Sequence, residues 1–197
     1  IASLLVKGLL QLSGQKLHFS GIGGPCMKAA GFNAKISMEE LSVRGYVEVL
    51  RHLPRLFALR QRLAKQWLES RPACFIGVDA PDFNLGLEQK LRTGGIKTFH
   101  LVCPSIWAWR AERIKKIRAA VSYMLCIFPF EQELLAKENV PASYVGHPLA
   151  DMIPEQTDQQ AARESLGLEI NRPVIALLPG SRQDEINYIA PRFIQAA

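Results

Sequence analysis

The sequence lacks several features that would place it in a familiar class of protein. It contains no run near the ~20 apolar residues that a helix needs to cross a bilayer, so we expect no spanning helix, while contact with a membrane surface stays open. No CxxC pair occurs, which argues against a paired zinc site. Cys74, Cys103 and Cys126 lie in apolar, strand-like runs, where reduced core thiols are the simpler interpretation.

Two common phosphate-binding signatures are also missing. The dinucleotide-binding pattern GxGxxG is absent from the glycine-rich stretch near residue 21, because Met27 stands where no glycine helps. The GK[ST] of a Walker A loop is absent as well.

The composition is that of a globular chain. Hydrophobic residues make up 48% and charged residues 21% of the 197 positions, which argues against disorder. A chain of this length can bury on the order of 70% of its unfolded surface. Lysine and arginine outnumber aspartate and glutamate by 24 to 18, a net charge of +6. This balance favours an anionic partner, such as nucleic acid, a phosphorylated metabolite or an anionic lipid.

Short apolar runs alternate with helical patterns along the chain. The strand-like runs are Leu17–Ile22, Cys74–Val78, Thr98–Cys103, Tyr123–Phe128, Ser143–Val145 and Val174–Leu178. The helical patterns between them include Leu85–Arg92, Glu112–Ala119 and Glu131–Lys137. This alternation predicts an α/β fold with a parallel sheet that helices cover on both faces. Ligands of such sheets bind at the carboxyl ends of the strands.

A shift in composition predicts a domain boundary between Gly146 and Arg172. Pro148, Pro154 and a polar run follow the last strand of the first unit, and Val174–Leu178 restarts a strand–loop–helix pattern. We therefore expect a first domain over residues 1–155, a linker over 156–172 and the start of a second domain over 173–197. Because the chain begins at Ile1 without a methionine and both ends fall in apparent helices, we expect a fragment of a longer protein.

Asp79 is the strongest catalytic candidate in the first unit. It follows a buried strand at the end where ligands bind, nothing local needs a carboxylate there, and a carboxylate so placed can act as a general base. Asp82 precedes a helical run and is better interpreted as the N-cap of that helix. His147, at a later strand end, is interpreted first as a hydrogen-bond partner, with a general base as the alternative.

Three further segments each allow a structural and a functional interpretation. The loop Gly21–Pro25 is either an anion site or a tight turn. The segment Pro104–Arg110 places Trp107 and Trp109 beside Arg110, so its indoles either close over the sheet or, with Arg110, bind a sugar, base or phosphate. Pro179–Arg182 offers the amides of Gly180 and Ser181 and the guanidinium of Arg182 to a phosphate, with Glu185 suited to the helix dipole or to capping.

The segment Gly45–Glu69 combines apolar and basic residues. Pro54 predicts two helices or a kinked pair. Core packing explains a stripe at helical spacing, whereas lipid contact would explain both the surplus apolar positions and the local excess of positive charge. The stripe consists of Tyr46, Val49, Leu50, Leu53, Phe57, Leu63 and Trp67.

Six motifs in order along the chain resemble those of the lipid-A-disaccharide synthases. They are GIGGPCMKAAG at 21–31, LSVRGYVEVL at 41–50, IGVDAPDFN at 76–84, PSIWAWR at 104–110, VGHP at 145–148 and LLPGSR at 177–182. The resemblance implies a type B glycosyltransferase of two Rossmann-like domains, with this chain covering an incomplete N-terminal acceptor and membrane domain and the start of a UDP-sugar domain. It implies transfer of 2,3-diacylglucosamine from its UDP derivative to 2,3-diacylglucosamine 1-phosphate with inversion, giving lipid A disaccharide 1-phosphate and UDP.

The resemblance also implies roles for particular residues. Asp79 and Arg182 match the family's essential aspartate and arginine, which we expect on opposite walls of one cleft. Substrate-binding positions are implied at Asn84, Trp109, Arg110, Gly180, Ser181 and Glu185. The family's membrane-facing apolar patch corresponds to Val47, Val49, Leu50, Leu53, Leu56 and Phe57.

The resemblance implies no metal and no cofactor, and a location in the cytoplasm on the inner face of the bacterial inner membrane. The partners it implies are the two lipid-linked sugars and an anionic membrane surface, with a homodimer of the intact protein left open. The alternative enzyme is of the UDP-N-acetylglucosamine 2-epimerase type, which needs neither acceptor nor lipid patch. A nucleic-acid-binding module is the weakest alternative, since the basic residues cluster beside strand ends without a nucleic-acid motif.

Overall fold

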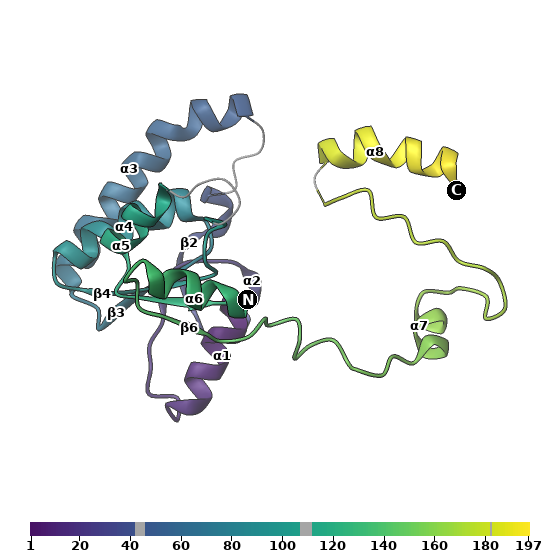
Figure 1. Cartoon of the computed structure of the whole chain (residues 1–197), viewed down its shortest axis with the longest axis horizontal. Coiled ribbons are helices and arrows are strands. Elements are labelled where there is room, and N and C mark those ends of the chain that lie inside the picture. The colour runs from purple at the N-terminus through teal and green to yellow at the C-terminus, as the bar shows by residue number, and fades with distance from the viewer. Residues whose placement is uncertain (42–45, 107–111, 182) are drawn as a thin grey trace. The chain divides into compact units, whose positions relative to one another are not determined.

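The computed structural model describes the backbone of residues 1–41, 46–106, 112–181 and 183–197, and the same side chains except those of 46–52 (Figure 1). The chain divides into two compact units, Ile1–Ile153 and Pro154–Ala197. Within the described residues, no helix is both long and apolar enough to traverse a membrane.

The larger unit contains a four-stranded parallel sheet whose strands follow one another in chain order. Its strands are β3 (Cys74–Val78), β4 (Lys97–Leu101), β5 (Tyr123–Cys126) and β6 (Ala142–Tyr144). Each connection contains a helix, namely α4 (Pro81–Thr93), α5 (Arg113–Ala120) and α6 (Pro129–Lys137). Figure 1 shows α4 and α5 side by side over the strands. The predicted α/β fold with parallel strands is confirmed.

A second, two-stranded parallel sheet precedes it, where a single sheet was expected. It pairs β1 (Ser20–Gly23) with β2 (Asn33–Ser37). Around it lie α1 (Ala2–Leu12), α2 (Pro25–Ala29) and the short 3-10 helix η1 (Met38–Leu41). Among the described strands, β1 and β3 share no hydrogen bonds. The two sheets are joined instead by packing, since Ile22, Ile36 and Phe75 all contact one apolar cluster.

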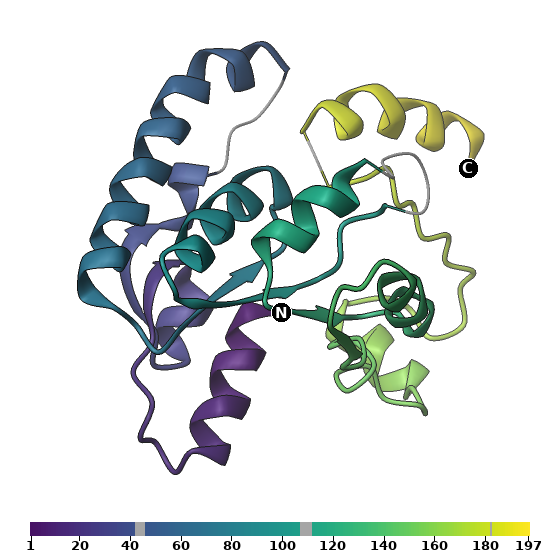
Figure 2. The ribbon, with the colours of Figure 1, turned by 60° about the vertical axis from the view of Figure 1, so that its left-hand side comes forward.

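One long helix, α3 (Tyr46–Ser70), occupies the segment for which two helices or a kinked pair were predicted. The helix continues through Pro54, so the prediction of two separate helices is wrong. The ribbon bends in its N-terminal part (Figure 2), in line with the kinked alternative, because proline removes one intrahelical hydrogen bond.

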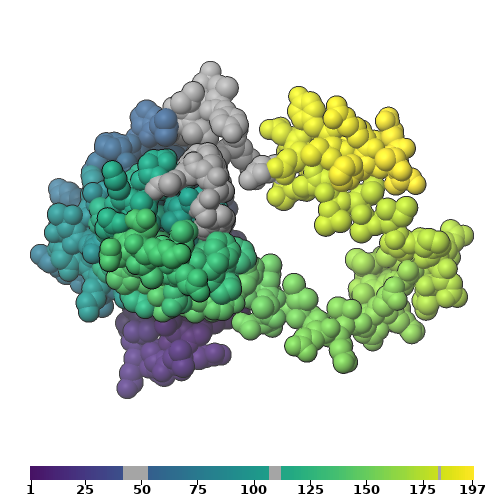
Figure 3. All heavy atoms as spheres, viewed as in Figure 1, coloured from purple at the N-terminus to yellow at the C-terminus, as the bar shows by residue number. Residues whose placement is uncertain are grey.

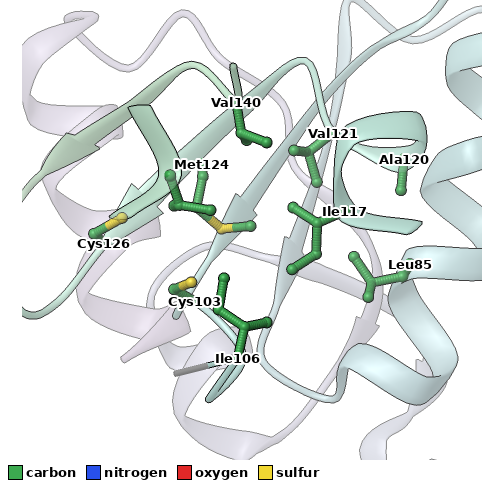
Figure 4. Close-up of a cluster of buried hydrophobic side chains, with 10 residues drawn as sticks. Leu85, Cys103, Ile106, Ile117, Ala120, Val121, Met124, Cys126 and Val140 are labelled. Atoms are coloured by element: carbon green, nitrogen blue, oxygen red, sulfur yellow. The ribbon is translucent and has the colours of Figure 1, made fainter. Parts of the chain in front are cut away.

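Two apolar clusters form the core of the larger unit. In the first, buried residues of α4, α5, α6, β5 and the loops beside them meet (Figure 4): Leu85, Cys103, Ile106, Ile117, Ala120, Val121, Met124, Cys126, Leu135 and Val140. In the second, α3 packs against α4 through Leu59, Leu63, Ala64, Leu87, Leu91 and Ile96. Cys103 and Cys126 are buried free thiols as expected, but Cys74 is exposed, so its assignment to the core was wrong.

The smaller unit contains two helices joined by extended chain (Figure 1). These are α7 (Gln159–Ser165), capped by Asp158 Oδ1 accepting from the Ala161 N–H at 3.0 Å, and α8 (Gln183–Ala196). Figure 3 shows the atoms of this unit in yellow-green and yellow. The strand predicted over Val174–Leu178 is absent from the described structure, and its apolar side chains are exposed. An apolar run forms a strand only where a neighbouring strand can pair with its backbone.

Candidate active site

Asp79 lies directly after β3 and is held by its backbone from two sides. Its N–H donates to the carbonyl of Leu101, at the end of β4, at 2.9 Å. Its own carbonyl accepts from Asn84 Nδ2, on α4, at 2.7 Å. The residue is exposed. The fold therefore fixes the main chain of Asp79 and leaves the residue accessible at the ligand-binding edge of the sheet.

The backbone at this edge is strained. Asp79 has φ +52° and Ala80, the N-cap of α4, has φ +44°, while Val102, after the adjacent strand β4, has φ +77°. Left-handed backbone costs a residue with a side chain roughly 1–2 kcal/mol, and it is a marked outlier for a β-branched residue such as valine. Strain of this kind gathers at functional sites, which makes this sheet edge the candidate site.

Asp82 has a different role from the one predicted. The helix begins at Pro81, before the expected start at Leu85, so Asp82 stands in the first turn and its side chain makes no capping hydrogen bond. Its carboxylate pairs instead with Arg113 Nη2 of α5 at 2.6 Å. The N-cap prediction is therefore wrong, because the cap position falls on Ala80.

Asn84 is buried, and its amide nitrogen is directed to the backbone. Besides the bond to Asp79, Nδ2 lies 3.4 Å from the carbonyl of Val78. In this structure the side chain thus positions the β3–α4 turn.

Aromatic side chains occupy the ends of the strands β5 and β6. The rings of Phe128 and Phe130 stack with their centroids 5.9 Å apart, and His147 lies 6.0 Å from Phe128. Both phenylalanines are exposed. His147 Nδ1 accepts from the Leu149 N–H at 3.2 Å, in line with the hydrogen-bond interpretation. Sequence analysis missed this aromatic group, although the run Phe128–Phe130 after a strand was its signal.

Glu131 supports the loop that carries these rings. Its Oε2 accepts from the backbone N–H groups of Ile127 at 3.2 Å and Phe128 at 3.1 Å. Burial raises the pKa of this carboxyl, and the two backbone donors partly offset the rise.

A buried glutamate–histidine pair, also missed by sequence analysis, lies next to β3. Glu88 Oε1 of α4 is 2.8 Å from His100 Nδ1 of β4, and both side chains are 0% exposed. Burial raises the pKa of Glu88, while its hydrogen bond and charge interaction with His100 lower it. The signal in the sequence is weak, since β4 also contains Lys97 and Thr98 besides His100.

The glycine-rich loop at Gly21–Pro25 is shaped by close packing. A side-chain carbon on Gly23 would stand 2.8 Å from the ring of Phe32, and one on Gly24 would stand 2.2 Å from Met38 Sδ. The helix that follows, α2, has only 5 residues. These contacts favour the interpretation of a tight turn.

The exposed apolar residues of α3 lie near its N-terminal end. Leu53 is 49% and Phe57 54% exposed, and Leu56 is partly buried. Arg60 lies over the Phe57 ring, 5.3 Å from its centroid, and Lys90 lies 6.0 Å from it. In contrast, two apolar residues of α3 that lie off the stripe pack into the core, namely Leu59, which is buried, and Leu68, which is partly buried. The side chains of three patch residues lie outside the described ones: Val47, Val49 and Leu50.

Only part of the stripe packs into the core, because the helix extends past the body of the unit. Figure 2 shows the N-terminal half of α3 projecting beyond α4. Leu63 and Trp67 pack against the core as predicted, whereas Leu53 and Phe57 do not. Helical spacing identifies the residues that share a face, but it does not show how far the neighbouring element reaches.

In the smaller unit, the loop before α8 donates a backbone hydrogen bond to a carboxylate side chain of that helix. Glu185 Oε2 accepts from the Ser181 N–H at 3.1 Å, so its carboxylate occupies a donor that was assigned to phosphate. Gly180 has φ +121° and lies against the same carboxylate. The capping interpretation of Glu185 is therefore observed. Three other predicted site residues lie outside the described residues: Trp109, Arg110 and Arg182.

Asp79 follows β3, whereas the stacked phenylalanines and His147 follow β5 and β6, so these residues lie along the same edge of the parallel sheet. Among the residues described, no group of three or more histidine, cysteine, aspartate or glutamate side chains could hold a metal ion. A hollow of about 200 Å³ lies elsewhere, between α3 and the β1–β2 sheet, lined by Gly21, Lys35, Ile36, Arg62, Leu63, Gln66 and Trp67.

Comparison with known proteins gives a consistent result. A family model described as lipid-A-disaccharide synthetase matches residues 2–197. The lipid-A-disaccharide synthase of Paraburkholderia phymatum is 56% identical over 196 residues, covering 100% of this chain and 50% of that protein. Those of Bordetella petrii and Chromobacterium violaceum are 55% and 54% identical over 197 and 181 residues, covering 100% and 92% of this chain and 50% and 47% of theirs. The chain therefore spans about half the length of these curated relatives.

Proposed function

The chain belongs to the lipid-A-disaccharide synthase family, and we propose that the intact protein is an inverting glycosyltransferase of lipid A biosynthesis. It would transfer 2,3-diacylglucosamine from its UDP derivative to 2,3-diacylglucosamine 1-phosphate. The products would be lipid A disaccharide 1-phosphate and UDP. The observation that carries the proposal is Asp79, a carboxylate-bearing residue on a strained, doubly anchored turn at the ligand-binding edge of a parallel sheet.

In this mechanism Asp79 acts as the general base. Its carboxylate takes the proton from the acceptor's 6-hydroxyl as that oxygen attacks the anomeric carbon of the donor sugar. The bond from the anomeric carbon to the UDP oxygen breaks, and the electron pair leaves with UDP. Attack from the face opposite to the leaving group inverts the anomeric centre. Phe128 and Phe130 place exposed apolar side chains at the same sheet edge.

The leaving diphosphate needs positive partners, for which we propose Arg182 with the amides of Gly180 and Ser181. The Ser181 amide is held by Glu185 in the structure. A phosphate oxygen could take that amide only after the Glu185 carboxylate moves aside, because two anions repel each other at one donor. Glu185 is proposed as a contact of the donor's hydroxyl groups. Trp109 and Arg110 are proposed as further substrate contacts.

We further propose that the domains divide the substrates between them. Residues 1–155 would bind the acceptor, 156–172 would link the domains, and 173–197 would begin the domain for the UDP-sugar. The exposed apolar side chains of Val174–Leu178 support a segment that becomes a strand when the remainder of such a domain surrounds it.

The acyl chains call for an apolar surface that lipid can reach, and we propose α3 for it. Leu53 and Phe57 are exposed, and the cations Arg60 and Lys90 lie near the Phe57 ring. Exposed apolar residues together with cations bind a helix to anionic lipid. Val47, Val49, Leu50 and Leu56 would extend this patch on a peripheral protein of the inner membrane's cytoplasmic face. A homodimer of the intact protein is compatible with this arrangement.

The decisive experiment replaces Asp79 by asparagine in the intact protein. Loss of the base should lower turnover by about 10²–10⁴-fold without changing the melting temperature. Asp82→Asn is the matched control, since Asp82 is also an exposed aspartate of this turn but pairs with Arg113, and it should keep turnover within about threefold. Near-normal turnover of Asp79→Asn would remove Asp79 from the mechanism. Conversion of UDP-N-acetylglucosamine alone, without acceptor, would identify the epimerase instead.

A further inference from the structure

The buried pair Glu88–His100 links three elements beneath the candidate site. Glu88 is on α4, His100 is on β4, and their side chains meet at 2.8 Å over β3. A side-chain carbon on Gly77 of β3 would stand 2.1 Å from Glu88 Oε1 and 3.2 Å from His100 Nδ1. The pair therefore fills the space that a side chain at this position would need, in direct contact with the strand.

The same three elements hold Asp79. On α4, Asn84 lies one turn before Glu88, on the same helix face, and its amide holds the Asp79 carbonyl. On β4, Leu101 follows His100 directly, and its carbonyl holds the Asp79 N–H. The distance between α4 and β4 thus determines whether Asp79 can form its hydrogen bonds to Asn84 and Leu101 at the same time.

We propose that Glu88 and His100 are positioning residues, whose hydrogen bond holds α4 and β4 in the register that orients Asp79. This inference rests on the proposed role of Asp79 as the base. A directional bond is suited to the task, because apolar contacts would allow α4 to slide along the sheet with little change in free energy. A displacement of about 1 Å can cost on the order of 100-fold in rate.

The Glu88–His100 pair stabilises the fold less than well-packed apolar residues at these positions would. Glu88 Oε2 and His100 Nε2 have no hydrogen-bond partner among the described residues. A buried polar atom without a partner costs about 1–3 kcal/mol, and well-packed apolar residues often replace a buried ion pair at no loss of stability. The Glu88–His100 pair therefore lowers stability relative to apolar residues but fixes the geometry next to the strained turn.

The test uses leucine variants of the intact protein. Glu88→Leu and His100→Leu should each lower kcat about tenfold or more and leave KM within about twofold, because substrate still binds while the base is misplaced. Glu88→Gln should keep kcat within about threefold, since its amide can bond to the imidazole in either tautomer. The double variant Glu88→Leu with His100→Leu should regain the melting temperature but not kcat.

A control separates positioning from loss of stability. Thr98 is on β4, two residues before His100, and its buried hydroxyl donates to the Ala120 carbonyl at 2.7 Å. Thr98→Val should lower the melting temperature about as much as the single leucine variants while leaving kcat unchanged. The inference is overturned if kcat follows the melting temperature across all these variants, or if the double variant regains both.

The outcomes also separate this inference from the proposed function. If Asp79→Asn abolishes turnover and the leucine variants leave kcat unchanged, only the positioning role fails. If Asp79→Asn retains turnover, the role of Asp79 itself fails, whatever the leucine variants do.

Discussion

Asn84 Nδ2 donates to the backbone carbonyl of Asp79 across 2.7 Å, so a buried helix side chain holds the residue that we propose as the base. One amide group thus serves the backbone, and the predicted contact of Asn84 with a substrate stays a prediction. The sequence places both residues in one motif, and the structure makes one the support of the other. The strained backbone of the turn and the hydrogen bonds that anchor it therefore act together on Asp79. Substitutions can test the strain and the anchors separately.

Replacing Ala80 by glycine should relieve the strain. Ala80 has φ +44°, which glycine adopts at little cost. Glycine also gives the unfolded chain more conformational entropy, which offsets part of the relieved strain. We therefore expect a net gain of about 0.5–1 kcal/mol in the free energy of unfolding, measured with urea. Ala58→Gly, at an exposed position inside α3, should lose about 1 kcal/mol. Destabilisation of both variants by the same amount would show that the turn is not strained.

The apolar residues of α3 should determine vesicle binding of the intact protein. Leu53→Ser with Phe57→Ser should reduce partitioning onto anionic phosphatidylglycerol vesicles about tenfold or more, since each buried side chain contributes about 1.5–3 kcal/mol. Leu12→Ser with Leu17→Ser removes comparably exposed apolar residues near α1 and should leave partitioning unchanged. Equal effects of the two double variants would count against a specific patch.

Native-state alkylation should rank the four cysteines. Cys26 is exposed and should react first with iodoacetamide. Cys74 is exposed as well, but burial of its thiol raises its pKa, so less reactive thiolate is present and labelling should be slower. Cys103 and Cys126 are buried and should react only after unfolding. Peptide mass spectrometry over time gives the order, and labelling of Cys103 as fast as Cys26 would contradict the fold.

Glu131 should make stability fall as pH rises. Its pKa in the folded chain lies above the ordinary value of 4.5, so the folded state binds more protons than the unfolded state between those two values. The free energy of unfolding therefore decreases as pH increases through that window. Glu131→Gln should flatten this decline, whereas Glu133→Gln, an exposed neighbour on the same helix, should not. Urea titrations at several pH values measure both, and identical pH profiles would refute the assignment.

Sequence patterns were sufficient where local signals agreed. The strand Cys74–Val78 was located at its observed bounds, because an apolar, β-branched run ends in Asp-Ala-Pro-Asp. The helix after it was predicted to begin late, since Pro81 at its first position carries a start signal that was not used. Asp79 was identified at this sheet edge from its place after the strand alone.

The remaining errors come from tertiary context. Strand β2 alternates polar residues with Ala34 and Ile36, a pattern of period two that lacks the apolar continuity expected of buried parallel strands. The burial of Leu59 and the exposure of Phe57 depend on how far α4 extends along α3. The spacing of apolar residues within α3 carries no information about that extent. The Glu88–His100 contact joins positions 12 residues apart, and nothing in either segment alone predicts it.

The chain-order arrangement of β3, β4, β5 and β6 has a consequence for how the protein is made. Each new strand pairs with the one synthesised just before it, so no strand of this sheet waits for a distant partner. Ribosomal synthesis can add one strand–helix module at a time to a growing template, and the contacts required at each step are close in sequence, which favours fast folding. Both anchors of the Asp79 turn come from Asn84 and Leu101, so that turn needs no residue of the later modules for its hydrogen bonds.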